Sequence, residues 1–311
     1  MTSTSLNPMG EFFERLGHKI VQTETASWYE VQSGALFSFP YYKLIEPQQS
    51  EIDRLLQEHK LKVIRYPTSI NNFGFVSTLA VNTNPNYDLS NQHQKARNQT
   101  RRGLENCTVE QIGFNYLIEN GLLLNKDTAQ RQGRESQYAD PNYWQKYCQA
   151  AQATTGVSAW GAFIGGKLAA FLVAIEVDDW VEWVVNHSAT SFRDKYPNNA
   201  LVLKTAQYFF KEKKYRGICY GLGSLEVTSD LDHFKNRMGW TLQPIKQRLI
   251  FSKKMRLVAS LAQEPCLKVL SRLFPKSYAV RKSVAIFRLY QQQTYCVPHP
   301  SGEQKDLADN S

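Results

Sequence analysis

The stretch GAFIGGKLAAFLVAIEVDDWVEWVVNHS, residues 161–188, carries the strongest structural signal in the 311-residue sequence. It contains long runs of apolar and aromatic residues interrupted by two short turn-like dipeptides, Gly165-Gly166 and Asp178-Asp179. Such dipeptides between runs of β-forming residues are typical of tight hairpin turns. The pattern therefore predicts an antiparallel meander. Its three strands are expected at 158–164, 168–177 and 180–187.

Helices are expected on both sides of this meander. Asp140 is a good N-cap and Pro141 suits the first helical position, so a helix should begin there and run to about residue 153. A second helix, capped by Asn198, carries apolar residues at helical spacing. The sequence then predicts a strand at 217–221, a glycine-containing loop, a short helix at 231–239 and a last strand at 242–251.

The N-terminal half repeats this alternation of strands and helices less clearly. One helix should begin at Ser50, and a polar helix should cover 89–106. Asn120-Gly121 is interpreted as a turn at the end of the half. Strands are expected at 28–31, 36–41, 61–66, 74–81, 109–112 and 116–124.

The predicted fold class is α/β of the α+β type, with mixed, largely antiparallel sheets flanked by helices. A chain of this length should hold two domains. We expect an N-terminal lead (1–17), a first unit (18–128), a second unit that holds the active site (136–252), and a basic helical extension with a polar tail (253–311).

The positive charge of the protein is confined to one segment. The net charge is +9, but residues 1–240 together contribute only +1. Residues 241–290 contain 11 basic residues and a single acid, Glu264. This distribution argues against a general nucleic-acid-coating protein, and against a DNA partner, and favours one localised anionic contact.

Several protein classes are excluded by composition. No run of 18 apolar residues exists, so no membrane-spanning helix is expected. The first twenty residues lack the features of a secretory signal, and five scattered cysteines without a C-x-x-C pair fit a reducing cytoplasm. Neither the cysteines nor the six histidines show metal-ligand spacing, so no metal site is expected.

Three segments resemble the FemAB-like acyltransferases, which are built from two tandem GNAT-type units. The first is the meander followed by a loop and a long helix. The second is CYGLGS (219–224) followed by LDHFKNRMG (231–239), which is similar to the family's FK segment. The third is the basic helix KARNQTRRGLEN (95–106). The resemblance covers about residues 20–252 and implies tandem GNAT-like units that use aminoacyl-tRNA or an acyl thioester as donor.

The sequence also departs from the family pattern. The usual GNAT loop Q/R-x-x-G-x-G/A, whose backbone amides hold the coenzyme A pyrophosphate, is missing, because 191–199 contains no glycine. The strand before the FK segment reads Ile218-Cys219-Tyr220-Gly221 and lacks the acidic residue found in many relatives. The helical arm of the tRNA-dependent members is also missing.

Lys235 and Glu182 are the first two catalytic candidates. The ammonium group of Lys235, behind a glycine loop, could bind a donor phosphate or stabilise an oxyanion; alternatively it is a surface lysine paired with Asp232. Glu182 could deprotonate the incoming amine. The alternative is a polar side chain on the solvated face of the sheet, which it would share with Trp180, Val184 and Asn186, opposite His187.

The remaining candidates bind substrate or donate a proton. Tyr220 or Ser224 could protonate the leaving group, and Gly221 and Gly223 would allow a ligand close to the backbone, although turn geometry alone explains such glycines. His187 could be a base or simply a polar residue at the strand end, and it is placed among the substrate-binding residues.

The polar helix presents Arg97 and Arg101 at i, i+4. They could bind phosphate of a tRNA acceptor stem, a coenzyme A or a nucleotide-linked acceptor, or they form a solvated helix face.

The basic segment 241–290 has an amphipathic pattern. Its apolar residues recur at helical spacing between basic ones, with Pro265 and Pro275 as breaks. Such a segment suits an anionic membrane surface, a tRNA backbone or an acidic acyl carrier protein. Alternatively, it forms terminal helices that pack on the second unit.

These features predict a bacterial-type cytoplasmic acyltransferase, in solution or peripheral at the inner membrane face. An acceptor amine would attack the ester or thioester of acyl-CoA or aminoacyl-tRNA, with no tightly bound cofactor. No acyl-enzyme is expected, because no cysteine or serine has an evident activating partner. The alternative is a non-catalytic GNAT-like module that binds anionic membrane, RNA or an acidic carrier protein.

Overall fold

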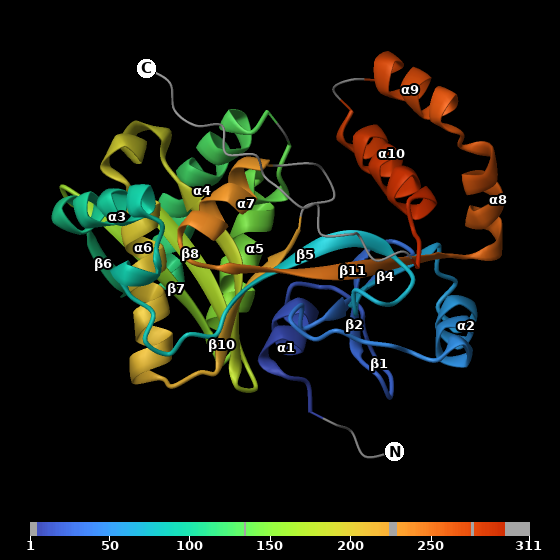
Figure 1. Cartoon of the computed structure of the whole chain (residues 1–311), viewed down its shortest axis with the longest axis horizontal. Coiled ribbons are helices and arrows are strands. Elements are labelled where there is room, and N and C mark those ends of the chain that lie inside the picture. Colours follow the sequence, from blue (N-terminus) through green and yellow to red (C-terminus); the bar gives the residue numbers. More distant parts are fainter. Residues whose placement is uncertain (1–4, 134, 224–228, 275–276, 296–311) are drawn as a thin grey trace.

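The described part of the chain folds around one mixed, mostly antiparallel sheet of eleven strands flanked by helices (Figure 1). This is a computed structural model, and it describes residues 5–133, 135–223, 229–274 and 277–295. The strands are β1 (Ile20–Gln22), β2 (Ser27–Gln32), β3 (Ala35–Phe39), β4 (Val63–Thr68), β5 (Phe75–Asn82), β6 (Thr108–Ile112), β7 (Val157–Ile164), β8 (Lys167–Val177), β9 (Trp180–Ser188), β10 (Gly217–Leu222) and β11 (Thr241–Phe251). The α-helices are α1 (Pro8–Arg15), α2 (Gln49–Glu58), α3 (Gln94–Asn106), α4 (Phe114–Arg131), α5 (Pro141–Gln152), α6 (Pro197–Gln207), α7 (Ser229–Arg237), α8 (Lys253–Leu261), α9 (Glu264–Leu273) and α10 (Tyr278–Gln291).

The strand order is β1-β2-β3-β4-β11-β5-β10-β9-β8-β7-β6. The neighbours β3–β4 and β9–β10 are parallel, and the other neighbouring pairs are antiparallel. The predicted fold class and the meander β7–β8–β9 are confirmed. The sheet crosses the predicted unit boundaries in both directions, because β6 pairs with β7 and β11 lies between β4 and β5. The division at 128 and 136 stays a prediction.

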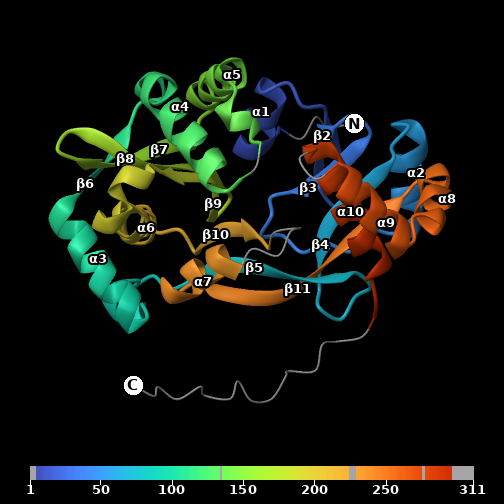
Figure 2. The same cartoon turned by 90° about the horizontal axis from the view of Figure 1, so that it is seen from above.

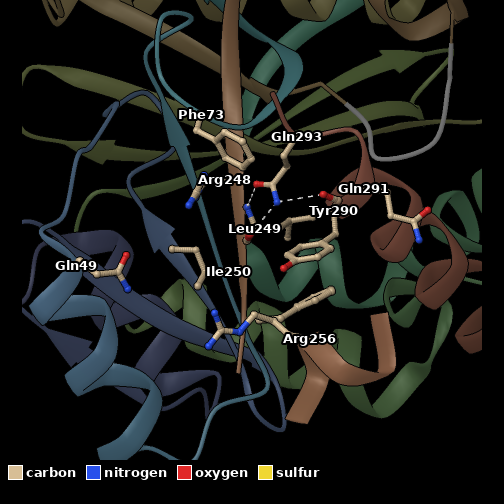
Figure 3. A pocket seen from close by; sticks show the side chains of 10 residues that line it. Gln49, Phe73, Arg248, Leu249, Ile250, Arg256, Tyr290, Gln291 and Gln293 are labelled. Atoms are coloured by element: carbon tan, nitrogen blue, oxygen red, sulfur yellow. Dashed lines mark hydrogen bonds between the residues drawn. The ribbon is translucent and has the colours of Figure 1, made fainter. Parts of the chain in front are cut away.

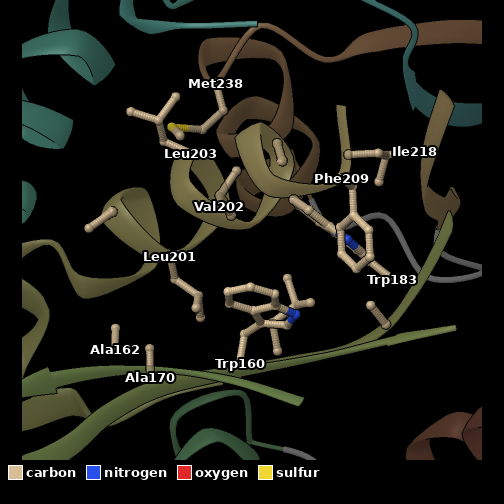
Figure 4. Packing of buried hydrophobic residues seen from close by; sticks show 14 of the residues in the cluster. Trp160, Ala162, Ala170, Trp183, Leu201, Val202, Leu203, Phe209, Ile218 and Met238 are labelled. Carbon is tan, nitrogen blue, oxygen red and sulfur yellow. The ribbon is translucent and has the colours of Figure 1, made fainter. Parts of the chain in front are cut away.

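Helices cover both faces of the C-terminal part of the sheet (Figure 2), and a hydrophobic cluster lies on each face. On one face, Leu201 and Phe209 from α6 and the turn after it pack against Trp160 of β7 and Trp183 of β9 (Figure 4). On the other face, α1, α4 and α5 pack around Phe171 of β8. No helix in the described ranges is long and apolar enough to cross a membrane.

The prediction of a strand at 116–124 with a turn at Asn120-Gly121 is wrong, because these residues lie in α4. Phe114, Leu117 and Leu124 are buried at helical spacing, and the indole nitrogen of Trp144 donates a 3.0 Å hydrogen bond to the Leu117 carbonyl. The apolar run is therefore the buried side of a helix. Helix α6 begins at Pro197, with Tyr196 rather than Asn198 as its N-cap.

Candidate active site

A pocket of about 440 Å³ opens where β9 and β10 separate. These parallel strands pair only between 180–182 and 217–219. Beyond this register β10 still pairs with β5 at Leu222 but no longer with β9, so the following residues of β9 and β10 line a gap. The lining residues are Phe37, Tyr41, Arg65, Gln132, Tyr138, Trp183, Val184, Val185, Asn186, His187, Tyr220, Gly221, Leu222, Gly223, Leu231, Lys235 and Lys282.

Lys235 lines this pocket from α7, and its side chain is almost completely buried. Its ammonium group lies 5.0 Å from the centre of the Tyr220 ring and 4.0 Å from the Asp232 carboxylate. Burial lowers the pKa of Lys235, and the nearby Asp232 partly opposes this shift. The interpretation of Lys235 as a surface lysine is therefore wrong, since only 3% of the residue is exposed.

Tyr220 forms the wall of the pocket beneath the ammonium group of Lys235. Its ring packs edge-on against Trp183 and Trp240, and its hydroxyl accepts a 2.5 Å hydrogen bond from the Asn186 amide. Burial raises the pKa of Tyr220, so the phenol stays protonated at neutral pH and keeps a proton to donate.

The glycine loop after β10 also reaches the pocket. Gly221 has φ of +82°, a conformation that a side chain would strain, and Gly223 donates a 2.7 Å backbone hydrogen bond to Thr78 of β5. The conformation and contacts of the backbone therefore explain why glycine occupies both positions. Both residues also line the pocket. Ser224 lies outside the described residues.

A β-bulge in β9 decides which residues face the pocket. Val173 pairs with Val185 and Ala174 with Trp183, so Val184 is the extra residue. The predicted shared face of Glu182, Val184 and Asn186 is therefore wrong. Val184 packs in the cluster under α4 and α5, whereas Asn186 bonds Tyr220 in the other cluster.

His187 lies on the same side of the bulged strand as Val184, not opposite it as predicted. Its Nδ1 is 2.6 Å from the Asn125 carbonyl oxygen, and the Asn125 amide donates to the Tyr138 carbonyl at 2.9 Å. These two hydrogen bonds orient the Asn125 amide so that its oxygen faces the imidazole. An oxygen can only accept, so the proton lies on Nδ1 of His187. His187 thus lines the pocket with a defined tautomer.

Glu182 is completely buried and does not line the pocket. Its Oε1 accepts a 3.0 Å hydrogen bond from the backbone N–H of Tyr42, and its carboxylate lies beside the Cys219 thiol. Burial raises the pKa of Glu182 to about 7, and these hydrogen bonds lower it less than burial raises it. The interpretation as a solvated polar residue is wrong. The carboxylate instead fixes the segment that carries Tyr41 into the pocket.

Two cations in the pocket were not identified from the sequence. Arg65 on β4 lies 4.5 Å from the Phe37 ring centre and donates to Gln247 at 2.7 Å, and burial lowers its pKa to about 10. Lys282 reaches the pocket from α10. No carboxylate lines this pocket in the ranges that the structure describes, so three cations face one hollow. The sequence feature that could have identified Arg65 is its position as the single arginine in the apolar run LKVIRY (61–66).

Arg97 and Arg101 are not brought to this pocket. Arg97 donates to the carbonyls of Ser90 and Gln92 at 3.3 and 3.1 Å, and Arg101 points to Asn98 on its own exposed helix face. Both residues lie on α3. Arg97 stabilises the segment before the helix, and Arg101 faces solvent.

Helix α3 lies directly on the first turn of α6. A side chain at Gly103 would come within 2.6 Å of the Tyr196 carbonyl, and the Arg102 guanidinium stacks on the Tyr196 ring at 5.0 Å. Helix α3 therefore packs against the first turn of α6, which follows the glycine-free segment where GNAT enzymes would hold a pyrophosphate.

A second pocket of about 350 Å³ lies beside β11 where its pairing with β5 ends (Figure 3). Gln293 closes this strand edge, because its amide accepts from the Leu249 N–H at 2.8 Å and donates to the Leu249 carbonyl at 3.0 Å. Arg248 and Arg256 line it, and none of the predicted site residues that the structure describes does. Its contacts attach the C-terminal extension to the sheet. Across the described ranges, no three His, Cys, Asp or Glu side chains converge on a metal site.

Solved structures show which proteins share this fold. FemX matches with a TM-score of 0.60 at 11% identity, over 83% of this chain and 94% of FemX. The L-PGS structure from Bacillus licheniformis matches with a TM-score of 0.53 at 14% identity, over 81% and 89% of the two chains. A C-terminal DUF2156 domain from Agrobacterium fabrum, assigned to a lysylphosphatidylglycerol synthetase, gives 0.55 at 11% identity over 82% and 91%. No protein-family model and no curated protein matches the chain. The resemblance to the FemAB-like, GNAT-type fold is confirmed.

Proposed function

We propose that this protein is an acyltransferase that moves an acyl or aminoacyl group from an activated ester to an amine in the pocket between β9 and β10. The observation that carries this proposal is the buried ammonium of Lys235, held over Tyr220 at the wall of a pocket without a lining carboxylate in the described ranges. A buried cation beside an open cavity is suited to stabilise a negative charge that develops on a substrate. The fold, shared with FemX and L-PGS, supports a transferase.

The reaction would proceed by direct attack. The acceptor amine forms a C–N bond with the donor carbonyl, and Lys235 stabilises the oxyanion of the tetrahedral intermediate. Collapse of this intermediate breaks the C–O bond of the donor ester. The proton lost by the amine passes to His187, and Tyr220 or His187 returns a proton to the leaving oxygen. Glu182 has no contact with the pocket and acts as a positioning residue through the Tyr41–Tyr42 backbone.

The donor is better matched by an aminoacyl ester, such as aminoacyl-tRNA, than by acyl-CoA. The loop that would hold a coenzyme A pyrophosphate has no glycine, and α3 packs against the first turn of the helix that follows it. The three pocket cations, Arg65, Lys235 and Lys282, suit a phosphate-bearing donor or acceptor. No tightly bound cofactor is part of this proposal.

A donor panel tests the proposed activity. We expect radiolabelled aminoacyl-tRNA to transfer its amino acid to an amine acceptor, and acetyl-CoA to give no protein-dependent product. The assay follows loss of the label from tRNA and its appearance in an alkali-stable amide. If no donor in the panel reacts, whereas the protein retains tRNA or anionic vesicles in a salt-dependent manner, the non-catalytic binding module is correct. The absence of the coenzyme A loop is the observation that favours that alternative.

A substitution of His187 tests its proposed role as the base. His187→Gln should lower kcat by about 10²-fold or more, because glutamine keeps a hydrogen-bond donor but cannot accept the proton. Asn125→Ala, which leaves the imidazole but removes the oxygen that holds its Nδ1 proton, should lower kcat by about tenfold. A folded His187→Gln protein with the wild-type kcat would show that another group takes the proton.

A further inference from the structure

Exposed apolar side chains are concentrated on two helices of the C-terminal extension. Thirteen large hydrophobic residues are exposed in the part of the chain that the structure describes, and seven of them lie between residues 257 and 274. The other six are scattered over the rest of the described chain. The seven are Leu257, Val258, Leu261, Val269, Leu270, Leu273 and Phe274. Such a concentration indicates a contact surface.

Helix α8 presents one apolar stripe to solvent. Leu257 and Leu261, four residues apart, are 66% and 71% exposed, and buried Ala259 lies on the opposite side of the helix. Lys253 and Lys254 flank the stripe and are also exposed. The helix therefore packs on the sheet with its small residue and turns its leucines outward.

Helix α9 repeats this arrangement. Leu267 is buried, whereas Val269, Leu270 and Leu273 form the exposed side. Lys268 and Arg272, at i, i+4, border that side. In Figure 1, α8 and α9 form the outer margin of the molecule at this end.

Negative charge is nearly absent from this surface. Glu264 is the single acid between residues 241 and 290, and its carboxylate is held by the Arg288 guanidinium at 2.9 and 3.1 Å. This ion pair fixes the start of α9 to α10. The cations along α8 and α9 therefore face solvent without a competing acid from this segment.

We propose that the outward faces of α8 and α9 dock on an anionic lipid bilayer. The exposed leucines and valines would enter the boundary between headgroups and acyl chains, and the flanking lysines and arginines would contact lipid phosphates. The apolar stripes favour a bilayer over a tRNA, because a tRNA backbone would be bound by the cations alone and would leave the leucines in water. The charge pattern and the apolar pattern are both accounted for by a membrane surface.

Docking would also bring the bilayer close to the helix that serves the pocket. Helix α10 packs between α9 and the sheet, and Lys282 on α10 lines the pocket between β9 and β10. The basic extension thus contributes to both surfaces. This inference does not depend on the proposed transfer reaction, since binding to vesicles is measured without any donor or acceptor.

Fluorescence from Cys266 tests the insertion directly. Cys266 is exposed on α9, whereas Cys107, Cys148 and Cys219 are buried. With Cys296 replaced by serine, the full chain can be labelled at Cys266 with an environment-sensitive dye. Vesicles of phosphatidylglycerol and phosphatidylethanolamine should shift the emission to shorter wavelength, and phosphatidylcholine vesicles should not. The same dye on Leu123→Cys of α4, with Cys266→Ser, should remain unshifted.

Co-sedimentation with the same vesicles provides the second measurement. The triple variant Leu257→Gln, Leu261→Gln, Leu273→Gln should bind about tenfold or more weakly, because the apolar contribution is lost while the charge is kept. Leu123→Gln, an equally exposed leucine (68%) on α4, is the matched control and should bind as the wild type does. Equal binding by the triple variant, or binding to tRNA but not to vesicles, would overturn the proposal. Circular dichroism confirms that each variant is folded.

Discussion

Replacing Lys235 by methionine should lower the rate of transfer by about 10²- to 10³-fold, which is the usual loss when one stabiliser of an oxyanion is removed. The ammonium group is almost completely buried, so its effect on a developing negative charge exceeds that of a surface lysine. Methionine fills the same volume without the charge. The loss should appear in kcat more than in KM, because the oxyanion exists only in the transition state and the intermediate.

The stability of this variant should be unchanged or slightly higher. The pKa of Lys235 is lowered by burial, so the wild-type protein pays a desolvation cost for the ammonium that methionine removes. Against this stands the loss of the contact with the Tyr220 ring. Thermal unfolding followed by circular dichroism measures the balance.

Lys246→Met is the matched control for Lys235→Met. Lys246 is also completely buried, but it lies on β11, bonds the Thr294 carbonyl at 2.6 Å and does not line the pocket. Its replacement should affect stability and leave kcat within about threefold. Lys235→Arg, which keeps the charge with a different shape, should recover part of the rate. Full activity in a folded Lys235→Met protein would remove this residue from the mechanism.

The strands of the meander could be predicted to within one or two residues because their signals are local. Glycine and aspartate pairs mark both turns, and each strand is long, apolar and rich in β-branched or aromatic residues. The same holds for the helix that begins at Pro141. The 116–124 segment failed because a short apolar run does not distinguish a strand from the buried face of a helix. The contact of this segment with Trp144, which is distant in the sequence, favours the helix over the strand.

The pocket depends on features that no local pattern contains. Arg65 reaches the site from β4, which β11 and β5 separate from β10 in the sheet, and α10 brings Lys282 from the far end of the sequence. Both follow from pairings and packing between distant segments. The β-bulge at Val184 then reverses the alternation in β9, so a strict two-residue period assigned His187 to the wrong side. Lys235 could be identified from the sequence because it lies in the FK segment. Its burial could not be predicted from the sequence.

The pH dependence of stability should change when Glu182 is replaced by glutamine. Burial raises the pKa of Glu182 from its ordinary value of 4.5 to about 7, so ionising this carboxyl costs folding free energy. The cost is absent below about pH 4.5, grows as the pH rises and is complete above about pH 7. Its upper limit is about 3 kcal/mol. Glutamine can still accept the hydrogen bond from the Tyr42 N–H and never ionises.

The free energy of unfolding of Glu182→Gln relative to the wild type should therefore rise by up to about 3 kcal/mol between pH 4.5 and pH 8. Urea unfolding at several pH values measures this change, and any cost of the new amide that does not depend on pH cancels. The exposed Glu119→Gln on α4 is the reference for removing a carboxyl group from the surface. Transfer by Glu182→Gln should stay within about threefold of wild type, because the carboxyl does not reach the pocket. A loss of about 10²-fold at every pH, in a protein that remains folded, would instead make Glu182 the base that accepts the proton of the amine.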